Sequence, residues 1–313
     1  MWQPSASIPH LRKRAEIIAQ VRTFFTDRGY LEVETPIMGR YGTTDVYLSN
    51  IKAQFRGQNY NLQTSPEYHM KRLLAAGSGP IFQLARVFRD DELGSWHNPE
   101  FTLLEWYQLN IDHHQLMAEM NEFLQIILHC QPLVRLTYQE AFLLACAVDP
   151  FNASIDELRA ALVHFQLDYV IPADETDADQ YLFLLMSHIV EPYLQKYSVP
   201  VAVYDFPVSQ AALAQVHQGR AQRFEIYYQG VELANGFHEL TDAAAQAQRF
   251  RRDQQIRQDK GFAEVAADEL LLEALARGLP PCSGVALGID RLIAIALNQT
   301  KIAHILAFAH DRA

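Results

Sequence analysis

Cysteine and long apolar runs are both scarce in this chain, and their scarcity excludes two classes of protein. The three cysteines, Cys130, Cys146 and Cys282, are odd in number and show no paired spacing of the metal-ligand or redox kind. A disulfide-built scaffold and a zinc knuckle are therefore disfavoured, and a reducing compartment fits best. The longest apolar runs, such as residues 292–297, are too short to cross a bilayer, and the first residues show no signal-peptide core. We expect a cytoplasmic protein without a membrane anchor.

Positive charge is also scarce. Lysine and arginine number 26 against 37 aspartates and glutamates, which leaves a formal net charge of -11. Proteins that grip nucleic acid neutralise its phosphates with Lys and Arg, so this balance argues against a general nucleic-acid binder, although a local basic patch is compatible with it. Apolar residues are plentiful instead: 49% of the chain is hydrophobic and 20% is charged, as in a folded globular protein.

The first part of the chain has the periodicity of helices and short strands. Apolar residues recur at helical spacing over residues 11–25, and the following YLEVETP alternates as a half-buried strand that ends at Pro36. Residues 40–64 have the pattern of short strands. We expect a helix over residues 66–76, with Ser65 as its N-cap.

The rest of the chain alternates strands with helices. Strands at residues 81–88 and 102–109 flank the polar loop DDELGSWHNPE, which predicts an antiparallel pair with a functional connection. Residues 137–200 are helical in pattern and carry no recognisable chemistry. The segments VAVYDFP and RFEIYYQGVEL are each predicted to be one strand, followed by a polar helix over residues 242–259. The last segment, GVALGIDRLIAIAL, predicts a strand, a glycine and a helix.

The loop between the first two strands, RVFRDDELGSWHNPEF, gathers Arg86, Arg89, His97 and Asn98 beside acidic residues. Arginine presents a planar fork that suits phosphate and carboxylate groups, and an aromatic side chain such as Phe101 can stack on a base. The alternative is a solvated, charged hairpin, and the spacing alone does not separate the two.

Carboxylates dominate a second segment, GVELANGFHEL, with Glu225 upstream of it. On one regular strand, the odd separation of Glu225 and Glu232 would put their side chains on opposite faces. A shared magnesium site would therefore need a bend or bulge, which Gly230 permits. Carboxylates with few basic neighbours suit magnesium or the amino groups of a cationic substrate. A polar turn with exposed carboxylates is the alternative.

The segment GVALGIDRL places a cation where a helix disfavours one. Arg291 falls in the first turn of an apolar helix that begins after Gly288, and the helix dipole is positive at that end. A bound anion would offset the mismatch, and phosphate is the natural candidate because helix N-termini and arginine both bind it. A salt bridge from Arg291 to a neighbouring carboxylate is the alternative.

Taken in order, these segments resemble the signature motifs of class II aminoacyl-tRNA synthetases, and more narrowly the lysyl-tRNA synthetase catalytic domain. The three motifs are DRGYLEVETP, FRDDELGSWHNPEF with LLEWY, and GVALGIDR, and TSPEYHMKR and ELANGFHEL match the lysine subfamily. The resemblance implies an α+β fold: an antiparallel sheet flanked by helices, forming a single catalytic domain over residues 1–313 and normally a homodimer joined partly through motif 1.

The resemblance also implies ATP and magnesium as cofactors, and a role for individual residues. Arg89 would hold the α-phosphate and the substrate carboxylate, Arg291 and His97 would reach the outer phosphates, and both arginines would be catalytic. Asp91 would meet the adenine amino group, Phe101 would stack on adenine, and Glu225 with Glu232 would hold magnesium. The remaining ATP-binding residues would be Asp90, Asn98, Leu233 and Gly288.

For the amino acid, the same template implies a pocket rich in carboxylates. Glu67 and Glu105 would face the amino group near the carboxylate, and Asn235 would face the carboxylate itself. Tyr107 and Glu239 would face the distal ammonium, so the pocket would select a substrate with two cationic groups. The other residues at the amino acid would be Ser65, Pro66 and Ala286.

Several departures from lysyl-tRNA synthetases bear on function. Motif 1 starts almost at once, which leaves no sequence for the anticodon-binding OB domain of those enzymes, and we expect no stable anticodon binding. Ser65 stands where the family typically has Ala, and Ala286 where it typically has Gly, so the pocket gains a hydroxyl and a methyl group. Asp91 replaces the more usual Glu and has a shorter reach toward adenine.

This combination is similar to a truncated branch of the lysyl-tRNA synthetase family whose members modify bacterial elongation factor P. The implied reaction is activation of (R)-beta-lysine as its adenylate, followed by transfer to the ε-amino group of a lysine on that protein. The alternatives are a reduced lysyl-tRNA synthetase-like enzyme that activates α-lysine, an asparagine-synthetase-like relative, and a non-catalytic regulator that binds an amino acid. Arg89, Glu225, Glu232 and Arg291 in one chain favour an enzyme.

Overall fold

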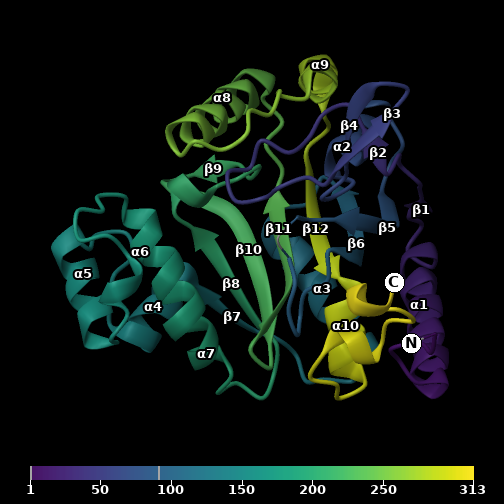
Figure 1. Ribbon diagram of the computed structural model, residues 1–313, viewed down its shortest axis with the longest axis horizontal. Coiled ribbons are helices and arrows are strands. Elements are labelled where there is room, and N and C mark those ends of the chain that lie inside the picture. The colour runs from purple at the N-terminus through teal and green to yellow at the C-terminus, as the bar shows by residue number, and fades with distance from the viewer. Residues whose placement is uncertain (1, 91) are drawn as a thin grey trace.

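A long, twisted sheet runs across the molecule. The computed structural model describes residues 2–90 and 92–313, whose nine-stranded sheet has the order β1-β5-β6-β12-β11-β10-β8-β7, with β9 paired to β10 (Figure 1). Neighbouring strands are antiparallel except β1 with β5 and β7 with β8. The bounds are β1 (Leu31–Glu32), β5 (Ile81–Phe88), β6 (Glu100–Leu109), β7 (Val134–Thr137), β8 (Val201–Phe206), β9 (Val216–His217), β10 (Arg220–Tyr228), β11 (Val231–His238) and β12 (Cys282–Gly288).

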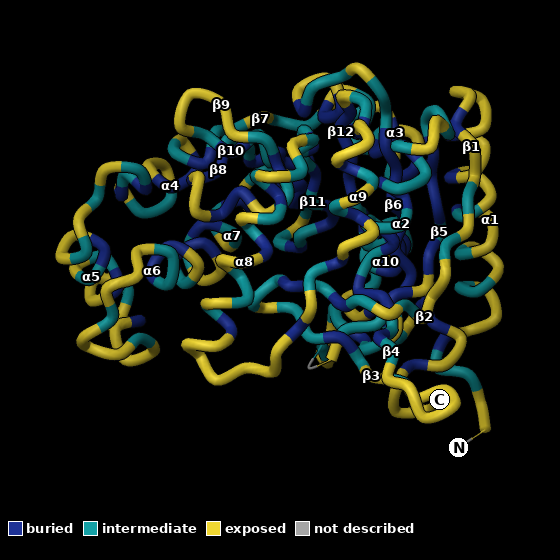
Figure 2. The backbone as a smooth tube through the Cα atoms, turned by 90° about the horizontal axis from the view of Figure 1, so that it is seen from above, coloured by how far each residue is buried: buried dark blue, intermediate teal, exposed yellow. Residues whose placement is uncertain are grey.

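One face of this sheet builds the main hydrophobic core. Helices α1 (Ile8–Thr26), α3 (His113–Leu128) and α10 (Ile289–Ala296) pack against it. Because side chains alternate along a strand, Trp106 of β6 points into this core, whereas its neighbours Glu105 and Tyr107 point to the other face. Figure 2 shows the central strands as largely buried and the outer loops as exposed.

Smaller units cover the rest of the sheet. A three-stranded sheet of β2 (Met38–Gly39), β4 (Gln58–Leu62) and β3 (Lys52–Phe55) lies beside α2 (Glu67–Ala75). Helices α8 (Ala243–Asp259) and α9 (Glu269–Gly278) pack with α2 over the ends of β5, β6 and β12. The strands of the described residues belong to these two sheets, so that part of the chain contains no OB-type barrel.

A helical lobe stands at the other end of the sheet, at the left of Figure 1. It comprises α4 (Tyr138–Cys146), α5 (Ile155–His164), α6 (Ala178–Leu185), a π-helical turn (Met186–Val190) and α7 (Glu191–Leu194), and it has a hydrophobic core of its own against β8 and β10. Short 3-10 helices lie at Asp168–Val170, Val208–Gln210, Ile302–His304 and His310–Arg312. The helical prediction for residues 137–200 is confirmed.

Most predicted elements are confirmed, but the strand in YLEVETP is much shorter than expected. Only Leu31 and Glu32 form β1, and Leu31 is 54% exposed, so the predicted half-buried strand is wrong. The chain leaves the sheet after the Val33 amide donates to the Phe82 carbonyl. Helix α2 begins at Glu67 with Pro66, not Ser65, as its N-cap, although the Ser65 hydroxyl accepts a hydrogen bond from the Glu67 amide at 3.0 Å.

The segment RFEIYYQGVEL is also not one strand. It forms the hairpin of β10 and β11, because Gln229 and Gly230 both adopt positive φ, 53° and 76°, as a two-residue hairpin turn requires. The register also shifts between Ile226 and Tyr227, which marks a bulge in the pairing. Among the described helices, none has the length and apolar character needed to cross a membrane.

Candidate active site

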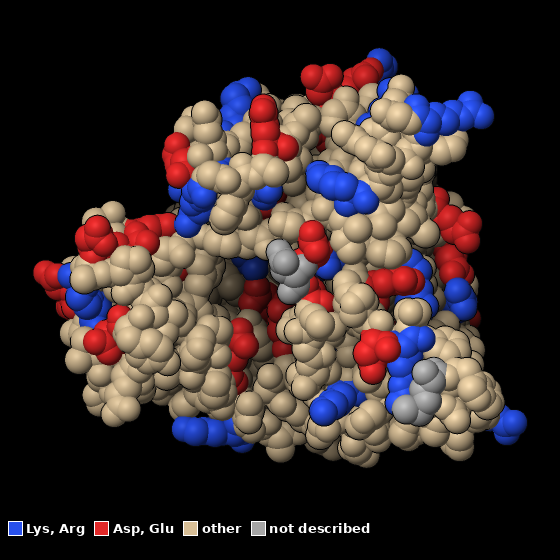
Figure 3. Space-filling view, in the orientation of Figure 1, with Lys and Arg blue, Asp and Glu red and all other residues tan. Residues whose placement is uncertain are grey.

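A cavity of about 770 Å³ lies on the face of the sheet opposite the main core. Figure 3 shows its mouth as a hollow beside the helical lobe, with acidic atoms inside it. Most of the predicted site residues line this single cavity, although they come from distant parts of the chain. Those that do are Ser65, Glu67, Arg89, His97, Asn98, Phe101, Glu225, Glu232, Leu233, Asn235, Ala286, Gly288 and Arg291.

Strand register aligns four of the predicted residues in one row across the sheet. Glu105 of β6 pairs with Ala286 of β12, Ala286 pairs with Asn235 of β11, and Asn235 pairs with Glu225 of β10. Cross-strand partners point to the same face of a sheet, so Ala286, Asn235 and Glu225 form a floor for the cavity, and Glu105 continues their row beneath its end. Ala286 is the smallest of them and sits between Glu105 and Asn235.

Arg89, at the end of β5, reaches the cavity with part of its guanidinium unpaired. Its Nη1 donates to Glu92 Oε1 at 3.1 Å, and the guanidinium carbon lies 5.1 Å from the centre of the Phe101 ring. Its buried Nε has no hydrogen-bond partner among the residues that the structure describes. A buried, unpaired N–H of a cation is costly, and an anion bound in the cavity would satisfy it.

Arg291 lies in the first turn of α10, as predicted. It donates from Nη1 to the Glu232 carbonyl at 2.8 Å and from Nε to the Trp96 carbonyl at 3.2 Å, and its Nη2 lies 2.7 Å from His97 Nε2. Since Nη2 can only donate, His97 Nε2 is the acceptor and the ring is neutral. Burial and the adjacent Arg291 lower the pKa of His97, in agreement with that state.

The other predicted ATP-binding residues differ in whether they line the cavity and in how far their polar groups are already hydrogen-bonded within the protein. Asn98 uses both ends of its amide within the protein: Nδ2 donates to the Glu100 carbonyl at 2.6 Å and Oδ1 accepts from the His310 amide at 3.0 Å. Asp90 is exposed and does not line the cavity. Asp91 lies outside the described residues. Phe101, Leu233 and Gly288 contribute apolar surface and backbone to the cavity wall.

The hairpin brings Glu225 and Glu232 onto the same face, as a shared cation site requires. Arg223 Nη2 and Tyr227 Oη donate to the two oxygens of Glu225, so this carboxylate is held in place. Burial, followed by repulsion from Glu225, raises the pKa of Glu232. A divalent cation between two carboxylates would relieve that repulsion, and magnesium is commonly held by one or two carboxylates together with substrate phosphates. The two residues therefore fit magnesium.

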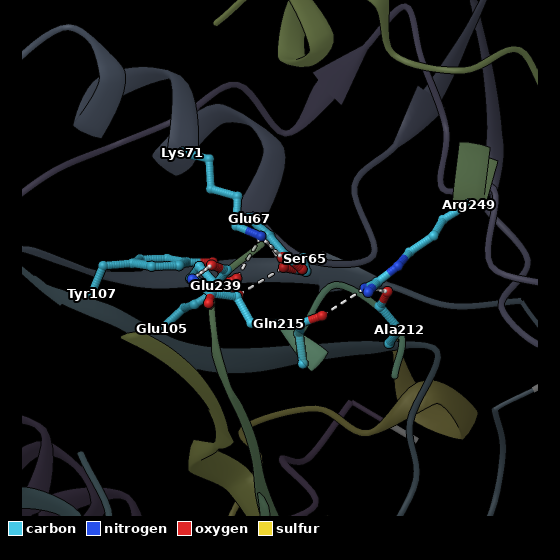
Figure 4. Close-up of polar contacts among 10 residues, drawn as sticks. Ser65, Glu67, Lys71, Glu105, Tyr107, Ala212, Gln215, Glu239 and Arg249 are labelled. Atoms are coloured by element: carbon cyan, nitrogen blue, oxygen red, sulfur yellow. Dashed lines mark hydrogen bonds and ion pairs between the residues drawn. The ribbon is translucent and has the colours of Figure 1, made fainter. Parts of the chain in front are cut away.

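Beneath the other end of the cavity lies a buried polar cluster around Glu105 (Figure 4). The Ser65 hydroxyl donates to Glu105 Oε2 and the Tyr107 hydroxyl to Glu105 Oε1, both at 2.7 Å. Gly284, which faces Tyr107 on β12, leaves no room for a side chain, because an added Cβ would stand 2.2 Å from the Tyr107 ring. Glu105 is thus held rigidly by its two hydroxyl partners.

Glu67 and Glu239 are joined through a residue that was not predicted. The Nζ of Lys71 lies 2.7 Å from Glu67 Oε1 and 2.6 Å from Glu239 Oε2, with 2% of the lysine side chain exposed (Figure 4). The contact with Glu239 is an ion pair without hydrogen-bond alignment, and Glu239 Oε1 has no hydrogen-bond partner among the described residues. One oxygen of this buried carboxylate therefore has no hydrogen-bond partner in the described part of the chain, although Glu239 lies behind the residues that line the cavity.

The pKa values of this cluster reflect its crowding of negative charge. Burial raises the pKa of Glu105 to about 7, and repulsion from Glu67 adds to the shift. Burial likewise raises the pKa of Glu239 to about 8, against the lowering effect of the Lys71 ammonium. Although burial acts in the opposite direction, Glu239 and Glu67 raise the pKa of Lys71, which stays protonated. The carboxylates of this cluster therefore bind protons that a dicationic ligand would displace.

Lys71 and Arg223 were not predicted as site residues, although the spacing of each from a predicted residue gives a local signal. Lys71 follows Glu67 by one helical turn, the spacing of an ion pair on a helix. Arg223 lies two positions before Glu225 and so points to the same face of β10, where it also donates to Asn235 Oδ1 at 3.2 Å. Neither spacing is specific by itself. Arg249 of α8 also lines the cavity, but its Nη1 donates to the carbonyls of Ala212 and Ala214.

Comparison with known proteins agrees with this geometry. Residues 5–312 match the family model described as tRNA synthetases class II (D, K and N), so the chain belongs to that family. Within it, the chain is 51% identical over 321 residues to the elongation factor P–(R)-beta-lysine ligase of Salmonella typhi, with 100% of this chain and 98% of that protein covered. The proteins of the same name from Salmonella gallinarum and Salmonella heidelberg match at the same identity and coverage. The resemblance found in the sequence is confirmed.

Proposed function

We propose that this chain is an ATP-dependent ligase that activates (R)-beta-lysine as its adenylate and transfers it to the ε-amino group of a lysine on elongation factor P. The observation that carries the proposal is the cavity itself: it has two arginines at one end, one of them with a buried, unpaired Nε, and a buried carboxylate cluster beneath the other end. Such a cavity suits a nucleotide beside an amino acid with two ammonium groups. The names of the relatives support the acceptor and the lysine isomer.

In the first step, a carboxylate oxygen of the amino acid attacks the α-phosphorus of ATP, and the bond to the bridging oxygen of pyrophosphate breaks. Such a displacement needs little proton transfer but much charge neutralisation and in-line positioning. Arg89 would hold the α-phosphate together with the attacking carboxylate, and its free Nε supports this role. Arg291 would bind the outer phosphates, which would replace His97 and the Glu232 carbonyl as its partners.

Magnesium, when bound by Glu225 and Glu232, would neutralise phosphate charge beside the leaving pyrophosphate. Arg223 and Tyr227 hold the Glu225 carboxylate toward the cavity floor. In the second step, the acceptor amine attacks the acyl carbon of the adenylate and loses a proton, an amide bond forms, and AMP leaves. Arg89 then stabilises the departing phosphate group.

Two side chains of the pocket support discrimination between lysine isomers. Ser65 fixes Glu105 by its hydroxyl, and Ala286 places a methyl group in the floor row between Glu105 and Asn235. A methyl-sized change in a pocket is worth about 1–3 kcal/mol of discrimination. An amino group on the β-carbon lies farther from the carboxylate than one on the α-carbon, so these two changes act at the position where the isomers differ.

We also propose a homodimer, joined partly through motif 1. Apolar residues are exposed there: Leu31 by 54%, Ile37 by 43% and Met38 by 39%. Apolar surface gathered in one place is typical of a protein interface. A single catalytic domain and a cytoplasmic location stay predictions. The reported ligase relatives are about as long as this chain, which supports an enzyme that works without a separate anticodon domain.

ATP–pyrophosphate exchange, measured with α-lysine and (R)-beta-lysine in parallel, tests the proposal. We expect exchange with magnesium present and a strong preference for beta-lysine, followed by mass addition to elongation factor P. Preference for α-lysine would favour a reduced lysyl-tRNA synthetase. Absence of exchange with either isomer would favour a regulator, against which the buried, unpaired Nε of Arg89 in the cavity wall argues.

A further inference from the structure

Lys71 is the one lysine in the carboxylate cluster of the described residues, and it bridges the two ends of the amino-acid pocket. Its ammonium contacts Glu67, assigned above to the amino group near the carboxylate, and Glu239, assigned to the distal ammonium. The lysine does not line the cavity but reaches the cluster from behind, through α2. A single buried cation therefore touches both carboxylates that would receive the substrate's amino groups.

The charges of the cluster match a doubly cationic substrate only because of this lysine. When all are ionised, the cluster has a net charge of −2, from three carboxylates and one ammonium: Glu67, Glu105, Glu239 and Lys71. Two substrate ammonium groups would bring this net charge to zero. Without Lys71 the net charge would be −3, and buried like charges at this density favour protonation of at least one carboxylate.

The hydrogen bonds separate Lys71 from a general role in holding the cluster together. Glu105 receives its bonds from Ser65 and Tyr107, whereas the contacts of Lys71 go to Glu67 and Glu239. Glu239 presents one oxygen to Lys71 and leaves Oε1 without a hydrogen-bond partner in the described part of the chain. The lysine thus neutralises one oxygen of Glu239 and leaves the other without a partner, behind the residues that line the cavity.

We propose that Lys71 is a positioning residue that sets the spacing of Glu67 and Glu239 and balances the charge of the carboxylate cluster, and so tunes the pocket for a diamino acid. This inference rests on the proposed function. The titratable groups that face Lys71 are Glu67 and Tyr68 of α2, Glu105 and Tyr107 of β6, Glu239 after β11, and Cys282 of β12, whose pKa burial and Glu239 raise to about 12.

The test is the pH dependence of KM for (R)-beta-lysine in ATP–pyrophosphate exchange, for the full chain and Lys71→Met. Loss of the cation raises the pKa of the neighbouring carboxylates, so we expect the acid limb of the profile to move up by about one pH unit. KM at neutral pH should rise about tenfold, with kcat and the KM for ATP changed much less. If Lys71 only stabilised the fold, Lys71→Met would lower Tm and impair all kinetic constants, but the acid limb of the pH profile would stay at its wild-type pH.

Arg72→Met is the matched control, because Arg72 is the next residue on α2 and its side chain makes no hydrogen bond or ion pair within the described residues. Arg72→Met should leave the acid limb of the pH profile at its wild-type pH. Lys71→Arg keeps the charge but cannot place one nitrogen between both carboxylates in the same way, so the limb should stay while KM rises.

The inference is overturned if the acid limb of the pH profile does not move in Lys71→Met, or if it moves by the same amount in Arg72→Met. If Lys71→Met does not fold, Lys71→Arg decides, and an unchanged KM in that variant contradicts a positioning role. The wild-type chain is measured in the same assay. A wild type inert toward both lysine isomers overturns the proposed function together with this inference, whereas an active wild type with an unmoved limb overturns the inference alone.

Discussion

The two ends of the cavity are built by opposite strategies. The nucleotide end places Arg89 and Arg291 on a loop and a helix start, with 25% and 22% of their side chains exposed. Arg89 pairs with Glu92 and keeps a free Nε, and Arg291 donates mainly to backbone carbonyls. The amino-acid end places Glu105 and Glu239 on the sheet, with 2% and 1% exposed. One end is cationic, accessible and adaptable, and the other is anionic, buried and rigid.

The difference follows from what each end must recognise. Phosphates are large, multiply charged and change position during the reaction, so partly solvated arginines whose partners can be exchanged suit them. Two ammonium groups at a fixed spacing are recognised best by carboxylates that cannot move, and burial strengthens each contact. We therefore expect specificity to depend mainly on the buried end and catalysis mainly on the exposed end.

The largest effect should come from the cationic end. Arg89→Ala removes the guanidinium proposed to bind the transferring phosphate, and we expect kcat for pyrophosphate exchange to fall about a thousandfold. The KM for the amino acid should change less. Arg86→Ala is the control, since Arg86 lies on the same strand, is exposed and pairs only loosely with Glu100 at 3.7 Å. A similar loss in both variants would contradict the division between the two ends.

At the anionic end, Glu239→Gln should act on binding rather than on chemistry. The change removes the carboxylate that we propose meets the distal ammonium, and it leaves Lys71 in an ion pair with Glu67 only. We expect KM for beta-lysine to rise about a hundredfold while the KM for ATP stays near its wild-type value. Glu273→Gln, on the exposed face of α9, provides the comparison. Equal changes in both KM values would contradict separate subsites.

Ala286→Gly sharpens the comparison within the pocket. Removal of the methyl group between Glu105 and Asn235 should broaden the pocket toward α-lysine. The ratio of kcat/KM for the two isomers should shift about tenfold, in keeping with a methyl-sized change. Competition between the isomers in pyrophosphate exchange measures this ratio directly. Unchanged relative kcat/KM for the two isomers would count against a steric role of Ala286.

The smallest effect should appear in the pH dependence of Tm, measured without added ligand. The pKa values of Glu105 and Glu239 are raised to about 7 and about 8, so the folded state holds protons that the unfolded state releases near pH 4.5. Their stabilising contribution is complete below the unfolded pKa and is lost as the pH rises through 7 and 8. We expect Tm to fall by roughly 2–4 °C from pH 6 to pH 9. Differential scanning calorimetry should show a smaller fall for Glu239→Gln, and an identical fall would exclude Glu239 as the source.

The sequence by itself determined the elements and the chemistry of several residues. The pattern of residues 102–109 predicted the strand that β6 confirms, and the apolar stripe after Gly288 predicted a helix with Arg291 in its first turn. Both depend on local spacing, which folding preserves. The ordered motifs predicted the family as well, because their residue types are dictated by the ligand rather than by the fold.

Only the tertiary structure decided which of these residues meet. The turn at Gln229 and Gly230 folds one apparent strand into a hairpin, and the register of that hairpin puts Glu225 opposite Asn235 and on the same face as Glu232. Lys71 acquires its second carboxylate, Glu239, from a segment far along the chain. Backbone pairing and burial between distant segments set these contacts, so no local spacing could have predicted them.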